Sequence, residues 1–169
     1  MQIKINLKIF LFIIIFCITK QIEIYGIIMF FALIHEIAHL ITGICLKLKP
    51  KSLSIMPFGL TVTFEDYDLL KIPIKRVIIA LAGPAINILI AIILGVIAET
   101  KHMETVIYSN LLIGAFNLIP VYPLDGGQIV KNLIYIKYNL KIANKITLLI
   151  SKTVVILLTF ISSIAILYF

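Results

Sequence analysis

Two histidines separated by three residues point to the first chemistry that this sequence suggests. The stretch HEIAH occupies positions 35–39, inside an apolar run from Ile24 to Leu46. On a helix, His35 and His39 lie one turn apart on the same face, a spacing that lets two imidazole nitrogens share one zinc ion. Glu36 borders that face at about 100° from His35, where it can deprotonate a zinc-bound water without being a ligand. Ionisable groups in the middle of a membrane-length segment are costly and usually functional.

The composition indicates a membrane protein. The chain has 169 residues, of which 62% are hydrophobic, whereas a soluble domain is typically about half apolar. We therefore predict an all-α polytopic membrane protein with one domain over residues 1–169. The net charge of +7 reports topology and lipid contact, and no motif indicates nucleic acid as a partner. Cys17 and Cys45 lie in apolar segments and are interpreted as small apolar residues, not as a disulfide or a metal pair.

About five transmembrane helices are expected. They are predicted at residues 1–19, 22–46, 74–98, 105–136 and 146–169, and the first is interpreted as an uncleaved helix because no cleavage site follows it. Between helices two and three, two short alternating runs flank the turn signal Met-Pro-Phe-Gly at 56–59. This pattern predicts a small membrane-associated β-hairpin from Ile55 to Phe64. An isolated hairpin is marginal in water, so we expect it to rest on the helices.

The centre of the fourth segment cannot be a continuous helix. Residues 117–127 contain two prolines and two glycines, and irregular backbone at membrane depth is tolerated only when it is buried in protein or lines a wet cavity. Asp125 follows this break, at the start of a new helix. One interpretation is a helix N-cap. The other is a third zinc ligand, because catalytic zinc takes three protein ligands and a water, and Asp125 is the only carboxylate besides Glu36 expected at membrane depth.

The distribution of lysines predicts how the chain sits in the membrane. Positive residues concentrate at the N-terminus, between helices two and three, and between helices four and five. The positive-inside rule then places the N-terminus in the cytoplasm. With this topology, the HEIAH stretch and Asp125 both fall in the cytoplasmic half of the bilayer, so they can meet.

Three motifs in order resemble the site-2 protease family of intramembrane zinc metalloproteases. They are HEIAH at 35–39, Ala-Gly-Pro-x-x-Asn at 82–87, and Asn-x-x-Pro-x-x-Pro-Leu-Asp-Gly at 117–126. The Met-Pro-Phe-Gly turn at 56–59 resembles the bacterial branch that includes stage IV sporulation protein FB. The resemblance runs from about Ile24 to Gln128 and implies one zinc ion.

The resemblance also implies roles for individual residues. The implied zinc ligands are His35, His39 and Asp125. Glu36 is implied as the general base. Asn117 is implied to bind the substrate backbone or the developing oxyanion, and Asn87 is carried over as a substrate-side polar group.

The function implied is an intramembrane zinc metalloendopeptidase of the bacterial cytoplasmic membrane, which hydrolyses membrane-associated substrates near the cytoplasmic side. A pro-sigma factor in sporulation is one such substrate. No nucleotide-sensing or PDZ domain is expected in the chain. The expected partners are a membrane-anchored protein substrate and the bilayer; a homo-oligomer or a regulatory membrane partner is left open. Two alternatives remain: a membrane metal-ion transporter, which predicts polar groups on both sides of the midplane, and a non-catalytic scaffold.

Overall fold

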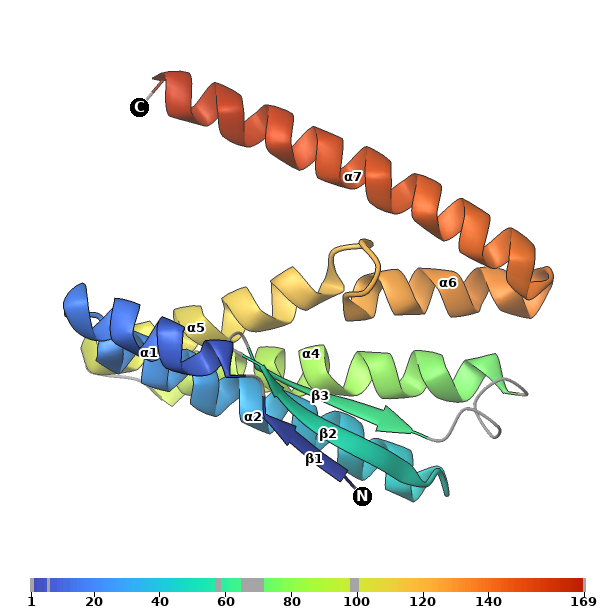
Figure 1. The fold of residues 1–169 in the computed structure, drawn as a ribbon, viewed down its shortest axis with the longest axis horizontal. Helices are drawn as coiled ribbons and strands as arrows, with labels where there is room; N and C mark the ends of the chain where they lie inside the picture. The colour runs from blue at the N-terminus through green and yellow to red at the C-terminus, as the bar shows by residue number, and fades with distance from the viewer. Residues whose placement is uncertain (1, 6, 57–58, 65–71, 98–100, 169) are drawn as a thin grey trace.

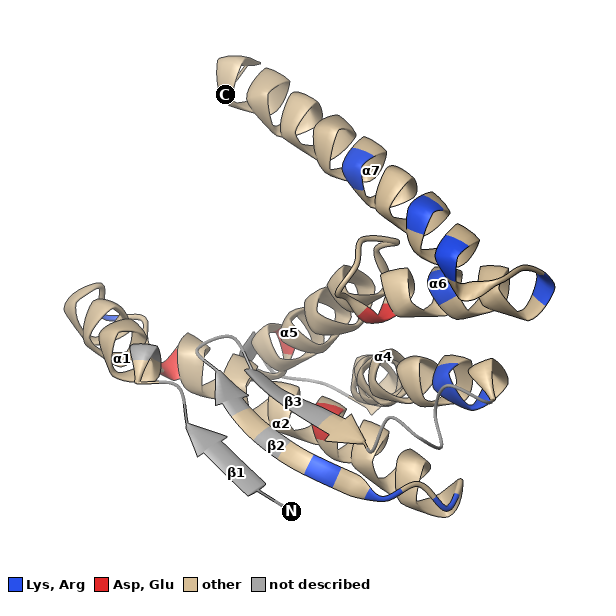
Figure 2. Cartoon of the chain, turned by 45° about the vertical axis from the view of Figure 1, so that its right-hand side comes forward, with Lys and Arg blue, Asp and Glu red and all other residues tan. Residues whose placement is uncertain are grey.

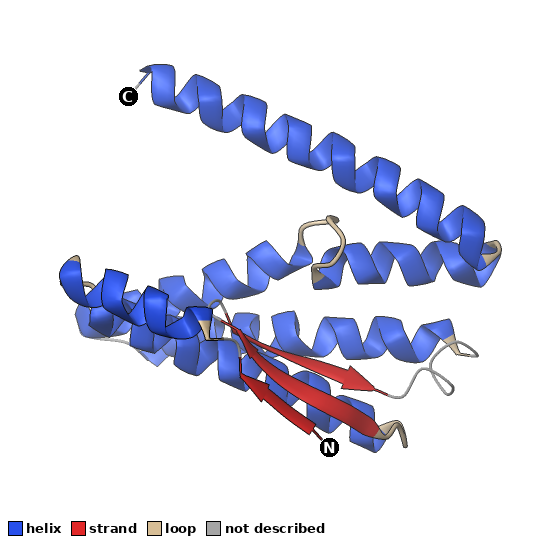
Figure 3. Ribbon diagram, in the orientation of Figure 1, coloured by secondary structure: helices blue, strands red, loops and turns tan. Residues whose placement is uncertain are grey.

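Helices make up most of the chain, and a small sheet lies against one side of them (Figure 3). The structure is a computed structural model that describes residues 2–5, 7–56, 59–64, 72–97 and 101–168. Its helices are α1 (Lys8–Ile18), α2 (Ile22–Cys45), α4 (Pro73–Ile97), α5 (Lys101–Leu118), α6 (Asp125–Lys137) and α7 (Leu140–Tyr168). Its strands are β1 (Gln2–Ile5), β2 (Pro50–Met56) and β3 (Gly59–Phe64).

Three of the described helices are long and apolar enough to cross a membrane. These are α2, α4 and α7, and they agree with the prediction of an integral membrane protein. The bounds predicted for the second and third helices lie within one residue of those of α2 and α4. The last helix begins at Leu140, earlier than the predicted Ile146, and it diverges from the other helices (Figure 1).

The first predicted helix is shorter than expected. Residues 2–5 form β1 instead, and α1 has 11 residues. At about 1.5 Å per residue such a helix is roughly 16 Å long, about half the thickness of a hydrocarbon core. The physical reason lies in a distant partner: β1 pairs in parallel with β2, with Gln2 opposite Ser52. A parallel pairing to a strand that lies far along the chain leaves no local turn signal.

The predicted hairpin is confirmed and is part of a three-stranded sheet of order β1-β2-β3. β2 and β3 are antiparallel, and Ser52 Oγ lies 2.7 Å from Thr63 Oγ1 across the pair. The turn residues 57–58 lie outside the described residues. Phe64 is buried and its ring packs directly on Gly43 of α2, where a side chain would overlap the ring. The sheet therefore rests on α2, as a marginal hairpin requires.

The fourth predicted segment divides into α5 and α6, joined by an irregular loop at 119–124 (Figure 1). This confirms that the prolines and glycines break the helix. A methyl group on Gly126 would overlap the carbonyl oxygen of Leu118, and one on Gly127 would overlap the backbone of Val121. The loop backbone thus packs directly on the first turn of α6, which holds Asp125 at the start of that helix.

Candidate metal centre

Three potential metal ligands meet between α2 and α6. His35 and His39 project from α2, and Asp125 is the first residue of α6. Asp125 Oδ2 lies 3.0 Å from His35 Nε2 and 3.2 Å from His39 Nε2. One ligand atom from each residue falls within 4.8 Å of the other two. Both histidines are buried and the aspartate side chain is only 12% exposed, so the group is largely removed from water.

In each ring, the Nδ1 atom, which is not the one nearest Asp125, forms a hydrogen bond with an oxygen of another helix. His39 Nδ1 lies 2.6 Å from the carbonyl oxygen of Ile79, on α4. A carbonyl can only accept, so His39 Nδ1 carries the proton. When the ring is neutral, its Nε2 then presents a lone pair toward Asp125. Such a partner, bonded to the far nitrogen of a ligand histidine, fixes the tautomer and the ring orientation.

A chain of two asparagines fixes the tautomer of His35 in the same way. Asn110 Nδ2 donates to the carbonyl of Val106 at 2.9 Å, which turns Asn110 Oδ1 toward Asn87. Asn87 Nδ2 donates to that oxygen at 2.8 Å, so Asn87 Oδ1 faces His35 Nδ1 at 2.6 Å. His35 Nδ1 must therefore be the donor, and its Nε2 is also a lone-pair acceptor. The carbonyl of Val106 therefore determines, through the two asparagines, which nitrogen of His35 carries the proton in the neutral ring.

In the neutral form of both rings, the three converging atoms have no proton to share. Two nitrogen lone pairs and a carboxylate oxygen then face one another, and a cation between them would stabilise this arrangement. Zinc bonds of about 2.0–2.2 Å in tetrahedral geometry bring ligand atoms to roughly 3.3 Å from one another. The separations of 3.0 and 3.2 Å between Asp125 and the rings are close to that value. The residues therefore fit a zinc ion, and their donor set is the one that zinc prefers.

Helix α4 packs directly against the two histidines. Gly83 of α4 is buried, and a methyl group there would overlap Nε2 of both His35 and His39. Pro84 follows within the same continuous helix, which does not break at this point. The glycine thus lets the α4 backbone approach the ligand atoms, and the small side chain is a steric requirement of the site.

The structure brings together three of the sequence-predicted site residues, and Glu36 and Asn87 lie beside them. Glu36 is partly buried next to His35 on α2 and lies within electrostatic range of His39. Asn87 is fully buried and bonded to His35 and Asn110. Asn117 donates to the carbonyl of Ile113 at 3.0 Å within α5. The substrate-binding roles of Asn87 and Asn117 stay predictions, and the contacts of Asn87 are those of a residue that positions His35.

Sequence reasoning missed three contributors to this site: Asn110, Gly83 as a steric element, and the carbonyl of Ile79. Asn110 had a readable signal, because an amide within a membrane helix needs a polar partner. The Ile79 carbonyl had none, since any backbone carbonyl in α4 was a candidate acceptor. Only the packing of α4 on α2 selects it.

Removing the side chain of Asn110, the asparagine farther from His35, should weaken zinc binding. In Asn110→Ala, the Nδ2 of Asn87 loses its acceptor, and Asn87 is free to turn away from His35. Loss of such an outer partner typically lowers metal affinity about 10- to 100-fold. Competition with a chelator of known affinity measures it. Asn117→Ala, which removes another α5 asparagine without touching the chain, should bind zinc like the wild type; equal loss in both variants would contradict this account.

Many of the described basic residues lie toward one end of the molecule (Figure 2). Figure 2 shows lysine or arginine positions where α2 ends, where α4 begins, and around the turn from α6 to α7, while an acidic position lies at the start of α6. This distribution is the one from which the cytoplasmic face was predicted. The orientation of the N-terminus stays a prediction.

Comparison with known proteins identifies similar chains. The sequence profile of peptidase family M50 matches residues 24–104 and 99–161. A zinc metalloprotease of Methanocaldococcus jannaschii is 28% identical over 134 residues, which cover 74% of this chain and 38% of that protein. Stage IV sporulation protein FB of Bacillus subtilis is 32% identical over 103 residues, covering 57% of this chain and 35% of that protein. The chain thus spans less than two fifths of the length of either relative.

A solved structure shares the fold. The site-2 protease from Methanocaldococcus jannaschii superposes with a TM-score of 0.72 at 23% sequence identity. The superposition covers 97% of this chain and 81% of the other. At this identity the likeness establishes the fold, including the helices that carry the two histidines and the aspartate.

Proposed function

Since the chain belongs to peptidase family M50, we propose that it is an intramembrane zinc metalloendopeptidase. It hydrolyses peptide bonds of membrane-anchored substrates near the cytoplasmic side of the bilayer. The observation that carries the proposal is the convergence of two imidazole nitrogens and one carboxylate oxygen at a buried point. Three protein ligands leave a fourth zinc position for water, which is the pattern of catalytic rather than structural zinc.

The proposed mechanism assigns one task to each group. His35, His39 and Asp125 would hold one zinc ion, which when bound would supply Lewis-acid activation of water and of the scissile carbonyl. Glu36 accepts the proton of the attacking water and delivers it to the leaving amine. Because Glu36 lies on the same helix as both histidines, its position relative to them is set by helix geometry alone.

The sheet suggests how a substrate is presented. β3 is an edge strand of the described sheet and packs along α2, the helix that carries the histidines. An extended peptide can add to such an edge through main-chain hydrogen bonds. A substrate helix must first unwind to expose those groups, so helix-breaking residues near the cleavage site favour hydrolysis. We propose β3 as the strand that receives the unwound substrate.

The likeness to stage IV sporulation protein FB supports a finer proposal about the substrate. A membrane-anchored regulator, such as a pro-sigma factor in sporulation, fits a protease whose active site lies in the cytoplasmic half of the membrane. A homo-oligomer or a regulatory membrane protein is proposed as a further partner.

The test uses the full chain in lipid nanodiscs with two reporters. Each reporter has one transmembrane helix; one carries a Gly-Pro pair near its cytoplasmic end and the other carries Leu-Leu there. We expect zinc-dependent cleavage of the first, loss of activity after chelation, and recovery when zinc is returned. Asp125→Asn keeps the size of the side chain but removes its charge, and it should lose both zinc and cleavage. Cleavage that persists in that variant or without zinc would overturn the proposal.

A further inference from the structure

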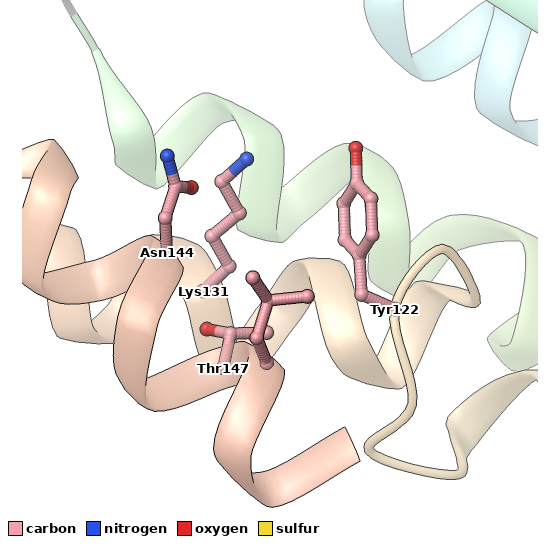
Figure 4. A pocket seen from close by; sticks show the side chains of 5 residues that line it. Tyr122, Lys131, Asn144 and Thr147 are labelled. Atoms are coloured by element: carbon pink, nitrogen blue, oxygen red, sulfur yellow. The ribbon is translucent and has the colours of Figure 1, made fainter. Parts of the chain in front are cut away.

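A pocket whose lining does not include the candidate metal ligands lies between the α5–α6 loop, α6 and α7. It has a volume of about 270 Å³, several times the roughly 30 Å³ that one water occupies in the liquid. Its lining residues are Tyr122, Lys131, Asn144, Thr147 and Leu148. Figure 4 shows the polar ends of Tyr122, Lys131 and Asn144 extending toward the same side. The pocket can therefore hold a polar group larger than one water.

One cation lines the pocket and a second lies near it. The ammonium group of Lys131 lies 5.0 Å from the centre of the Tyr122 ring, and Arg76 of α4 is close enough to interact with Lys131 electrostatically. Neither cation forms an ion pair with a described carboxylate. The Nε of Arg76 is buried without a hydrogen-bond partner in the described part of the chain. Each cation disfavours the charged form of the other, and an anion close to both would offset this repulsion.

A buried hydroxyl in the same pocket also lacks a partner. Thr147 is 2% exposed, and its Oγ1 has no hydrogen-bond partner among the described residues. Hydroxyls in helices ordinarily bond a carbonyl one turn back, as Ser151 does to Thr147 and Thr153 does to Leu149. A buried polar group without a partner is rare and calls for a ligand or a water. Thr147 is thus an available donor in the wall of the pocket.

These observations lead us to propose that the pocket binds a phosphate-bearing anion. Lys131 and Arg76 supply the positive charge, while Thr147 and Asn144 donate hydrogen bonds to the phosphate oxygens. Charge-assisted hydrogen bonds of this kind are the strong ones in proteins.

The headgroup of an anionic phospholipid is the source that best fits the surroundings. Leu148, in the pocket wall, is exposed on a helix long and apolar enough to span the membrane. Lys145 lies about one helical turn before Leu148 on the same helix, and Lys141 about two turns before it. Basic pockets between membrane helices on the cytoplasmic side bind such headgroups. Free inorganic phosphate has the same chemistry, so the experiment must separate the two sources.

The experiment measures lipid binding by the full chain in neutral detergent with short-chain lipids. Native mass spectrometry counts bound phosphatidylglycerol and phosphatidylcholine in separate titrations, and a third titration adds inorganic phosphate alone. We expect one phosphatidylglycerol to bind at least about tenfold more tightly than phosphatidylcholine, as charge-assisted bonds imply. Binding of inorganic phosphate alone with equal affinity would support the anion site and assign it to the soluble ion.

Variants link the binding to this pocket. Lys131→Met removes the charge and Thr147→Val removes only the hydroxyl, and each should weaken phosphatidylglycerol binding about tenfold. Lys152→Met is the control: Lys152 lies on α7, as Thr147 does, but does not line the pocket, so this variant should bind like the wild type. Circular dichroism and zinc content confirm that each variant folds. If Lys131→Met fails to fold, Thr147→Val decides the result. Equal affinity for the two lipids without a response to phosphate, or wild-type affinity in Thr147→Val, would overturn the proposal.

Discussion

Replacing Glu36 with glutamine is expected to abolish cleavage while zinc remains bound. The glutamine amide has nearly the same shape as the carboxylate, but it cannot accept the proton of the attacking water. Loss of a general base typically lowers the rate by about 10²- to 10⁴-fold. Glu36 is not one of the three residues that converge as ligands, so the zinc-to-protein ratio should stay that of the wild type. Single-turnover cleavage of a tethered reporter, together with elemental analysis, measures both quantities.

Glu23→Gln provides the matched control for this experiment. Glu23 is an exposed acidic residue in the first turn of the same helix, more than three turns from Glu36. The control should cleave like the wild type. Full activity in Glu36→Gln would remove this residue from the mechanism, and a joint loss of zinc and activity would assign it to the metal site instead of to proton transfer.

Adding one methyl group at Gly83 is expected to remove zinc binding. The methyl would occupy the space against Nε2 of both His35 and His39, so the rings or the α4 backbone must move. Alanine is a better helix former than glycine by about 1 kcal/mol. A weakened helix therefore cannot explain the loss. The effect should appear as an absence of bound zinc in a protein that keeps its helical circular dichroism.

Gly95→Ala isolates the steric cause. Gly95 lies on the same helix, and a Cβ there has no neighbour within 4 Å. This variant should bind zinc normally and be as stable as the wild type or slightly more so. Chelator competition on both variants makes the comparison direct. Wild-type zinc affinity in Gly83→Ala would show that α4 can move away from the two histidines without weakening zinc binding. The close approach of Gly83 to the histidines would then not be required for the site.

Much of the local structure could be predicted from the sequence, because local patterns encode it. The spacing of His35 and His39 places them on one helix face, and the prolines and glycines of 117–127 divide the fourth segment. The alternating runs around 56–59 predict the hairpin. Each of these signals acts over a few residues, so each can be read without knowing what packs against it. The parallel pairing of β1 with β2 depends on a partner about 50 residues away, and no local pattern predicts it.

The sequence by itself determined which groups could bind a metal and where a helix had to break, since residue type, helical periodicity and the backbone limits of proline and glycine are local properties. The tertiary structure decided the rest. Only the packing of α4 between α2 and α5 selects the Ile79 carbonyl, Asn87 and Asn110 as the groups that fix each imidazole tautomer. Only the close packing of the 119–124 loop on Gly126 and Gly127 places Asp125 next to the imidazole rings. Contacts between distant segments arise from the shapes of packed surfaces, which a one-dimensional pattern does not contain.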